Sequence, residues 1–351
     1  MRTITVHGKL TTSQILVGEH ITNLENYLPH KKIIVITDKN VNRIYRKYFS
    51  KFPSIVLEPG EKTKNLQTIE TIINKLLVLG ADRHTFLVGI GGGVVCDITG
   101  FVASVFMRGI DFGFVSTTLL SQIDASIGGK NGVNFQFYKN IIGTIRQPSF
   151  VICDINMLTT LPEKEIRSGW GEIIKHALIA DSFLFDKITR FNQNIFQFEH
   201  DFYLDLVFRN IHIKTSIVNN DEKEYGERKK LNFGHTIGHA IEKLTDLSHG
   251  ESVVLGILFS VWWSKEQMFL PQSDAMAISK FLNKFNLNQP KELSAEIILD
   301  VVKKDKKKYH DSIDFVFLEA IGRASVKRIS LMTLSKAIEA YFRDKQTRKM
   351  P

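Results

Sequence analysis

The chain has 351 residues, 43% of them hydrophobic and 24% charged, which is typical of a soluble globular protein. This length exceeds the usual size of one compact core, so we expect two domains. No apolar run is long enough to cross a bilayer, the N-terminus lacks the apolar core of a secretory signal, and two cysteines are too few for a disulfide framework. These features predict a cytoplasmic protein with no membrane partner.

The formal net charge is +9, and basic proteins often bind nucleic acid. Here the positive residues are spread along the chain. The densest run, at 303–310, has neither zinc-finger spacing nor an aromatic-flanked basic repeat. We therefore expect a solvated helix face or an anion pocket, and no nucleic-acid partner.

The first half of the chain alternates short apolar runs with helical patterns. Helices are predicted over 64–79 and 93–107, and the runs predicted as buried strands are 32–37, 54–59, 85–90, 112–117 and 150–155. This alternation is typical of βαβ units and a parallel sheet.

The pattern changes near Pro162 and is mostly helical from there on, with one β-hairpin predicted at 314–330. We therefore expect an α/β nucleotide-binding domain over 1–160 and a mostly helical domain over 161–351. In a protein of this design the functional site is expected in the cleft between the domains.

The stretch 87–101, LVGIGGGVVCDITGF, predicts a strand followed by a helix, with four glycines in five positions between them. Glycines let backbone N–H groups approach a phosphate closely, and a helix N-terminus adds partial positive charge. It is not a strict GxGxxG, because Val94 occupies the sixth position, and a plain strand-to-helix turn is the alternative. Asp97, one turn into the helix, is either part of the site or a polar anchor.

Polar residues at other predicted strand ends agree with a dinucleotide site. Asp38 follows one strand, Glu61 and Lys64 follow another, and Thr117 and Thr118 follow a third. Ligands of open parallel sheets collect at the carboxyl ends of the strands. Each residue taken alone could instead cap a helix.

Three histidines fall close together in NFGHTIGHA (232–240) and SHGE (248–251). His235 and His239 are spaced i, i+4 and share one helix face, so spacing alone favours them as a pair of metal ligands. Glu172, His249 and Glu251 are the other candidates. Spacing does not decide which two histidines bind, and packed structural imidazoles are the alternative.

Several cations stand in short polar contexts or interrupt apolar helices. Lys175 and Lys214 are of the second kind, which is costly unless each lysine meets an anion. Together these cations indicate a strongly anionic substrate, such as a sugar phosphate that carries a carboxylate.

From about residue 30 to 340 the chain resembles the 3-dehydroquinate synthase family, of the sugar-phosphate cyclase group. The matching stretches are GIGGGVVCDITGFVASVFMRG, STTLLSQIDASIGGKNG, YKNIIGTIRQP, LPEKEIRSGWGEIIKHALIAD, NNDEKEYGERKKLNFGHTIGHAIE and SHGES. The related glycerol and iron-dependent alcohol dehydrogenases share the two-domain plan but lack the DASIGGK and KN pair.

The resemblance implies a Rossmann-like NAD-binding domain followed by a mainly α-helical domain that binds metal and substrate. It implies that zinc, or cobalt, is held by Glu172, His235 and His249, while His239 faces the substrate phosphate. The implied NAD positions are Asp38, Glu61, Lys64, Gly92, Gly93, Asp97, Thr117, Thr118, Asp124, Lys139, Thr160, Leu161 and Glu165. The implied substrate and catalytic positions are Arg108, Asp124, Lys130, Asn140, Lys175, Lys214, Glu224, Arg228, Asn232, His239 and either Lys306 or Lys307.

The implied activity is conversion of 3-deoxy-D-arabino-heptulosonate 7-phosphate to 3-dehydroquinate and phosphate, in the shikimate pathway of aromatic amino acid biosynthesis. The route is transient oxidation by NAD, phosphate elimination, re-reduction and an intramolecular aldol reaction, and the usual family arrangement is a homodimer. The alternatives are another sugar-phosphate cyclase or a metal-dependent polyol dehydrogenase.

Overall fold

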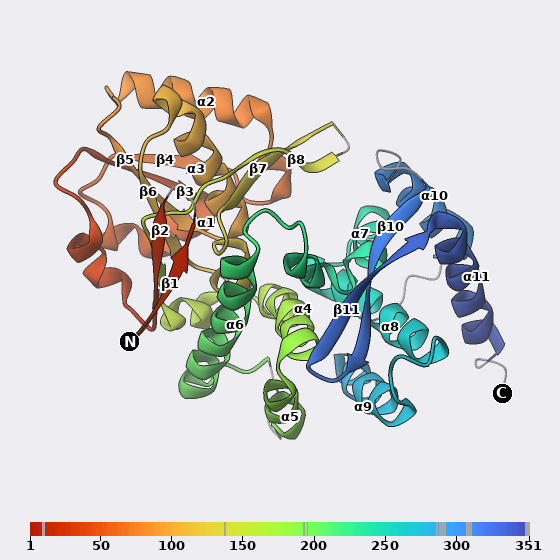
Figure 1. Ribbon diagram of the computed structural model, residues 1–351. Helices are drawn as coiled ribbons and strands as arrows, with labels where there is room; N and C mark the ends of the chain where they lie inside the picture. The colour runs from red at the N-terminus through yellow and green to blue at the C-terminus, as the bar shows by residue number, and fades with distance from the viewer. Residues whose placement is uncertain are drawn as a thin grey trace. The chain divides into compact units, whose positions relative to one another are not determined.

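The computed structural model of the protein (Figure 1) describes residues 1–8, 11–136, 138–191, 194, 196–285, 287, 293–306 and 311–347. The chain divides into two compact units. The first contains Met1–Gly169 and Phe198–Lys223, and the second contains Trp170–Gln197 and Glu224–Pro351. This division differs from the single boundary predicted near residue 160, because a later segment of the chain packs with the first unit.

The first unit is built on a seven-stranded sheet with the order β1-β2-β9-β6-β5-β3-β4. All neighbouring strands are parallel except β1 and β2, which pair antiparallel. The strands are β1 (Arg2–His7), β2 (Thr12–Val17), β3 (Ile33–Asp38), β4 (Ser54–Leu57), β5 (Phe86–Gly91), β6 (Phe112–Ser116) and β9 (Phe150–Cys153).

Apolar composition accounts for the strands that the sequence predicted. All residues of β5, β6 and β9 are buried, and such strands carry continuous apolar runs when helices cover both faces of a parallel sheet. All five predicted strands are confirmed. Four strands were not predicted: β1, β2, β7 (Lys130–Phe135) and its partner β8 (Tyr138–Ile145). Most residues of β1 and β8 are exposed or half-buried, and polar residues or glycine make up at least half of β2 and β7.

The helices and helical turns of the first unit are η1 (Ile21–Tyr27), α1 (Lys39–Tyr45), η2 (Arg46–Tyr48), η3 (Glu61–Thr63), α2 (Leu66–Val78), α3 (Gly93–Val105), η4 (Phe106–Arg108), η5 (Ser121–Ala125), η6 (Ile155–Thr160) and α6 (His200–Asn220). The predicted helices over 64–79 and 93–107 correspond to α2 and α3. Helix α6 contacts η5 and β1, which assigns Lys214 to this unit. The division between the units falls within α4 (Glu163–Ala180).

The second unit is mainly helical. After α4 it contains α5 (Ser182–Arg190), η7 (Glu227–Asn232), α7 (His235–Leu244), α8 (His249–Glu266), α9 (Gln272–Leu282), η8 (Asn283–Phe285), α10 (Ala295–Lys306), β10 (Ser312–Ala320), β11 (Arg323–Ser330) and α11 (Leu331–Thr347). Strands β10 and β11 form the predicted hairpin. Among the described residues, no helix is both long enough and apolar enough to span a bilayer.

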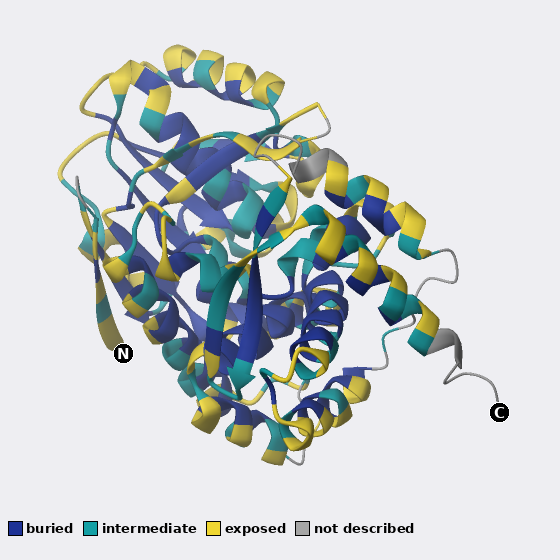
Figure 2. Cartoon of the chain, turned by 45° about the vertical axis from the view of Figure 1, so that its right-hand side comes forward, coloured by how far each residue is buried: buried dark blue, intermediate teal, exposed yellow. Residues whose placement is uncertain are grey.

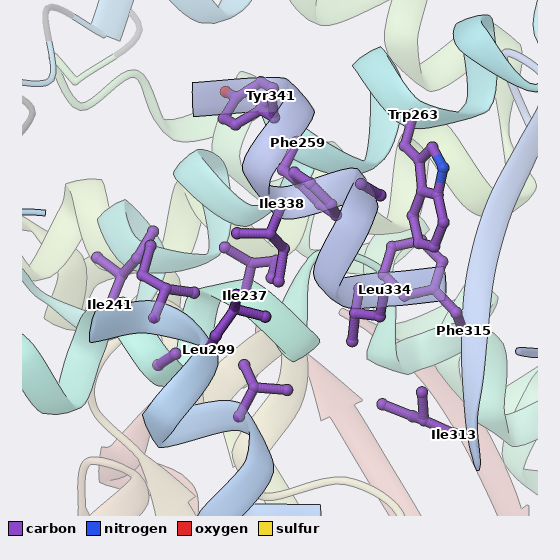
Figure 3. Close-up of a cluster of buried hydrophobic side chains, with 14 of the residues drawn as sticks. Ile237, Ile241, Phe259, Trp263, Leu299, Ile313, Phe315, Leu334, Ile338 and Tyr341 are labelled. Carbon is purple, nitrogen blue, oxygen red and sulfur yellow. The ribbon is translucent and has the colours of Figure 1, made fainter. Parts of the chain in front are cut away.

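One aromatic-rich core holds the second unit together (Figure 3). Phe259 of α8 lies at its centre, with its ring centroid 5.2 Å from that of Tyr341 on α11 and 5.7 Å from that of Trp263. Phe315 of β10 contacts Trp263 at 4.7 Å between centroids. Most residues of α8 are buried. Figure 2 colours the buried residues of the chain dark blue. The core around Phe259 fixes α8, the helix whose first residue is His249.

We expect Phe259→Ala to lower the free energy of unfolding by about 3–5 kcal/mol, because it removes a fully buried ring and leaves a cavity. Chemical denaturation of the full chain measures this loss. Met332→Ala, at a side chain that is 68% exposed, is the matched control and should change little. A loss below about 1 kcal/mol for Phe259→Ala would contradict this description of the core.

Candidate functional site

A buried carboxylate and two imidazoles meet in the second unit. Glu172 lies on α4, His235 is the first residue of α7 and His249 is the first residue of α8. The Nε2 atoms of His235 and His249 each lie 3.3 Å from Oε1 of Glu172, whose side chain is 0% exposed. One ligand atom from each residue lies within 4.8 Å of the others, so this group could hold a metal ion.

Close helix approaches bring the three residues together. A Cβ atom on Gly171 would lie 2.4 Å from the carbonyl oxygen of Gly250, and these two glycines neighbour Glu172 and His249. A Cβ atom on Gly256 would lie 1.9 Å from the carbonyl oxygen of Gly234, where α8 packs against the start of α7. Larger residues at Gly171 and Gly256 would push apart the helices that carry the group.

Glu251, a candidate ligand from the sequence, has a structural role. Its Oε2 accepts hydrogen bonds from the backbone N–H of Ser248 at 2.9 Å and from the Ser248 hydroxyl at 2.7 Å. With the Ser248 hydroxyl accepting from the Glu251 N–H, this is a capping box at the start of α8. The cap fixes where the helix begins, and therefore where His249 lies.

His239 belongs to a second, overlapping group. With Glu242 and His249 it offers three ligand atoms within 4.8 Å of one another, and its ring centroid lies 5.0 Å from that of His235. The i, i+4 spacing did place His235 and His239 near each other. Among the described residues, however, His235 is grouped with Glu172 and His239 with Glu242. The sequence analysis missed Glu242, although it lies seven residues after His235 on the same helix face.

The charges of this group compensate one another. Lys175 is buried and forms an ion pair with Oε2 of Glu172, while Oε1 faces the histidines. Burial opposes ionisation of Glu172, but the charge of Lys175 and the neighbouring imidazoles of His235 and His249 hold its pKa well below the usual range. Burial also disfavours a charged His249 ring, yet hydrogen bonds to Glu172 and Glu242 raise its pKa to about 10. An ionised carboxylate with two imidazoles is a donor set that suits zinc.

The segment that carries Arg228 and Asn232 is anchored beside the hairpin. Lys229 of η7 donates to Asp314 of β10 at 2.7 Å, and Arg328 of β11 donates to the same carboxylate at 2.9 and 3.1 Å. These hydrogen bonds, first from Arg328 and then from Lys229, lower the pKa of Asp314 to about 2.

Two further residues implied for the substrate meet in the same unit. Asn232 donates to Glu224 at 2.5 Å, and Glu224 has a positive φ of 63°. Arg228 is buried, whereas Asn232 is exposed.

The first unit gathers the predicted nucleotide residues at the carboxyl ends of its parallel strands. Gly92 is the N-cap of α3 and makes no side-chain cap hydrogen bond, so the first N–H groups of the helix have no side-chain partner there. A Cβ atom on Gly92 would lie 2.9 Å from Cγ2 of Thr118, and one on Gly93 would lie 3.0 Å from Cβ of Ala125. The glycines therefore serve tight packing, and they also leave backbone suited to a phosphate.

Several of these nucleotide residues also bond within the protein. Asp38 caps α1 by accepting from the N–H groups of Asn40 and Val41 at 2.8 and 3.0 Å. Glu61 accepts from Asn134 at 2.8 Å. Asp38 therefore caps a helix, which was the alternative role expected from the sequence. This role does not exclude a contact with a nucleotide.

Lys64 is buried and forms an ion pair with Asp97. Burial raises the pKa of Asp97, and the charge of Lys64 acts in the opposite direction. Lys214 likewise donates to Asp124, at 2.5 Å to the backbone oxygen and 2.6 Å to Oδ1. Both buried lysines thus have carboxylate partners.

Four further predicted residues, which are implied for the substrate or NAD, are exposed in the first unit. Lys130 begins β7, and Lys139 and Asn140 lie on β8, where the Asn140 N–H donates to Asn134 at 2.9 Å. Arg108 is exposed in a turn with φ of 66°.

The other predicted NAD positions follow strand ends. Thr117 is buried, and its N–H donates to Gly91 at 3.0 Å. The Thr160 hydroxyl lies 2.7 Å from that of Tyr45, Leu161 is the C-cap of η6, and Glu165 lies in the first turn of α4. Lys306 is the last residue of α10, and Lys307 lies outside the described residues.

Solved structures of two cyclases share this fold. One is 2-deoxy-scyllo-inosose synthase complexed with carbaglucose-6-phosphate, NAD⁺ and Co²⁺, which is 24% identical with a TM-score of 0.84 and coverage of 97% of this chain and 100% of that one. The other is 2-epi-5-epi-valiolone synthase from Streptomyces hygroscopicus with NAD⁺ and Zn²⁺ bound, which is 22% identical with a TM-score of 0.84 and coverage of 99% and 100%. The chain thus has the α/β plus helical fold of these cyclases.

Sequence comparison identifies the family. The family model for the N-terminal part of 3-dehydroquinate synthase matches residues 54–168, and that for its C-terminal part matches residues 169–308. A 3-dehydroquinate synthase from Alkaliphilus metalliredigens is 38% identical over 325 residues, which cover 90% of this chain and 89% of the relative. The chain belongs to the 3-dehydroquinate synthase family.

We expect His249→Ala to lose tight binding of one divalent cation per chain, because it removes one of three donors. Metal content after dialysis, together with competition against a chelator, measures the loss. His212→Ala, on α6 of the other unit, is the control and should retain the cation. Stoichiometric metal in His249→Ala would show that another set of residues binds it.

Proposed function

We propose that the protein converts 3-deoxy-D-arabino-heptulosonate 7-phosphate to 3-dehydroquinate and phosphate, as an NAD- and metal-dependent lyase. The observation that carries the proposal is the group of buried Glu172 with His235 and His249, and with Lys175 beside it, in a chain of this family. Related cyclases were solved with NAD⁺ and with Co²⁺ or Zn²⁺, which supports both cofactors.

Glu172, His235 and His249 would hold the divalent cation. The bound cation would supply a Lewis acid that lowers the pKa of a substrate hydroxyl. The donor set fits this role, since two imidazole nitrogens and one carboxylate leave a coordination position for substrate. The burial of Glu172 keeps bulk water from competing for the carboxylate.

In the first unit, the N-terminus of α3 at Gly92 and Gly93 would bind the NAD pyrophosphate. The other proposed contacts are Asp38, Glu61, Lys64, Asp97, Thr117, Thr118, Asp124, Lys139, Thr160, Leu161 and Glu165. Bound NAD would supply a hydride acceptor that later returns the hydride, so the reaction has no net redox change.

The cationic side chains would bind the substrate's two acidic groups. Lys175 and His239 lie in or beside the metal group and are proposed to contact the phosphate, together with Lys130 and Asn140. Arg228, Lys214 and Asn232 are proposed to hold the rest of the substrate, with Glu224 bonded to Asn232. Each charge-assisted hydrogen bond could contribute about 1.5–3 kcal/mol. His239 is also proposed to transfer protons, because an imidazole ring can both donate and accept a proton.

Burial of Lys175 and Lys214 does not by itself require a substrate anion, because Glu172 and Asp124 already pair with them. These carboxylates hold the two ammonium groups in place before substrate arrives. The support for an anionic substrate therefore comes from the family assignment and from the full set of cations.

The proposed activity is tested by following phosphate release from 3-deoxy-D-arabino-heptulosonate 7-phosphate while NADH absorbance is recorded. We expect stoichiometric phosphate release that needs NAD⁺, stops with a chelator and resumes with Zn²⁺ or Co²⁺. NADH should not accumulate. Accumulation of NADH with a polyol, without phosphate release, would instead indicate a dehydrogenase.

Lys175→Met should lower kcat/KM by about 10–100-fold, because it removes about 1.5–3 kcal/mol of charge-assisted binding. Binding of NAD⁺, measured by calorimetry, should be unchanged, since Lys175 and the nucleotide residues lie in different units. Lys336→Met removes an exposed lysine from the same unit as Lys175 and should leave kcat/KM unchanged. A wild-type kcat/KM in Lys175→Met would remove Lys175 from the phosphate site.

A further inference from the structure

Both histidines that face Glu172 have a partner for their second ring nitrogen. Nδ1 of His235 lies 3.1 Å from the backbone oxygen of Phe233. Nδ1 of His249 lies 3.4 Å from Oε2 of Glu242. A carbonyl oxygen and a carboxylate oxygen only accept hydrogen bonds, so both contacts favour a proton on Nδ1. Nε2 of each ring faces the Glu172 carboxylate, and a cation bound there would take the place of any proton on Nε2.

The two partners differ in charge and in freedom of movement. The Phe233 carbonyl is fixed by the backbone two residues before His235. Glu242 is a side chain on α7 that reaches the first residue of α8, and it is 14% exposed against 26% for His249. The His249 ring therefore lies between two carboxylates, Glu172 at Nε2 and Glu242 at Nδ1.

We propose that Glu242 is a positioning residue of the metal site, which holds His249 in the tautomer and orientation that present Nε2 to the cation. A carboxylate on the far nitrogen of a ligating imidazole also strengthens it as a donor. The inference rests on the proposed cation at Glu172, His235 and His249.

A second cation held by His239, Glu242 and His249 is the alternative role for the same contacts. If His249 used Nδ1 for that ion and Nε2 for the first, its ring would have to lose its remaining proton. A hydrogen bond from Nδ1–H to Glu242 needs no such deprotonation, so we favour the positioning role.

The test compares wild type, Glu242→Ala, Glu242→Gln and Glu339→Ala, each loaded with Co²⁺ after chelator treatment. Affinity is measured by chelator competition, and the visible d–d absorption bands of Co²⁺ report the ligand geometry directly. Glu339 is an exposed acid on α11 of the same unit, so its variant controls for loss of one negative charge.

We expect Glu242→Ala to bind Co²⁺ about 10–100-fold more weakly and to show altered d–d bands. Glu242→Gln should recover part of the affinity and most of the spectrum, because its amide oxygen still accepts from Nδ1–H. Glu339→Ala should match wild type. Thermal unfolding of the metal-free variants shows whether a variant is merely unstable, and the spectrum of the folded fraction still tests the proposal.

Wild-type affinity and spectrum in folded Glu242→Ala would overturn the positioning role while leaving the metal site intact. Two Co²⁺ ions per wild-type chain, falling to one in Glu242→Ala, would overturn it in favour of the second cation site. If wild type binds no Co²⁺, or if His249→Ala binds it as tightly as wild type, the proposed metal site itself fails and this inference fails with it.

Discussion

The fully buried carboxylate of Glu172 is the interaction on which the site in the second unit depends. An ionised carboxylate without partners in a protein interior is very unfavourable, and here it has three: the ammonium group of Lys175 on one oxygen and the imidazoles of His235 and His249 on the other. These partners lie on α4, α7 and α8, so the charge compensation requires those helices to pack in one arrangement. The glycines at the helix contacts, the capping box at Ser248 and Glu251, and the core around Phe259 all serve that arrangement.

The same principle recurs in the first unit, where Lys64 pairs with Asp97 and Lys214 pairs with Asp124. In each case a long cationic side chain is held in place by a carboxylate of the protein. The cost of ordering the side chain is therefore met during folding rather than on ligand binding. This pairing accounts for charged residues that interrupt helices that are otherwise apolar.

The sequence predicted the elements whose side chains are mostly buried, because a short continuous apolar run between turn residues is typical of a strand in the interior of a sheet. Strands β3, β4, β5, β6 and β9 and the hairpin β10–β11 were found in this way. Strands β1 and β8 were missed because they are mostly exposed, and β2 and β7 were missed because polar residues or glycine interrupt their apolar positions. The helical pattern of α6 was visible, but its packing with η5 and β1 was not, because an apolar helix face does not specify which partner covers it.

The sequence by itself determined the family, the parallel sheet with its glycine-rich turn, and a short set of histidines and carboxylates able to hold a cation. Only the tertiary structure decided which of them share a neighbourhood: Glu172 with His235 and His249, His239 with Glu242, and Glu251 with the cap of α8. Spacing along one helix places side chains on a common face, but Glu172 lies more than sixty residues before His235 in the chain. Contacts between helices so far apart depend on how closely their backbones can approach, and that is a property of packing rather than of local pattern.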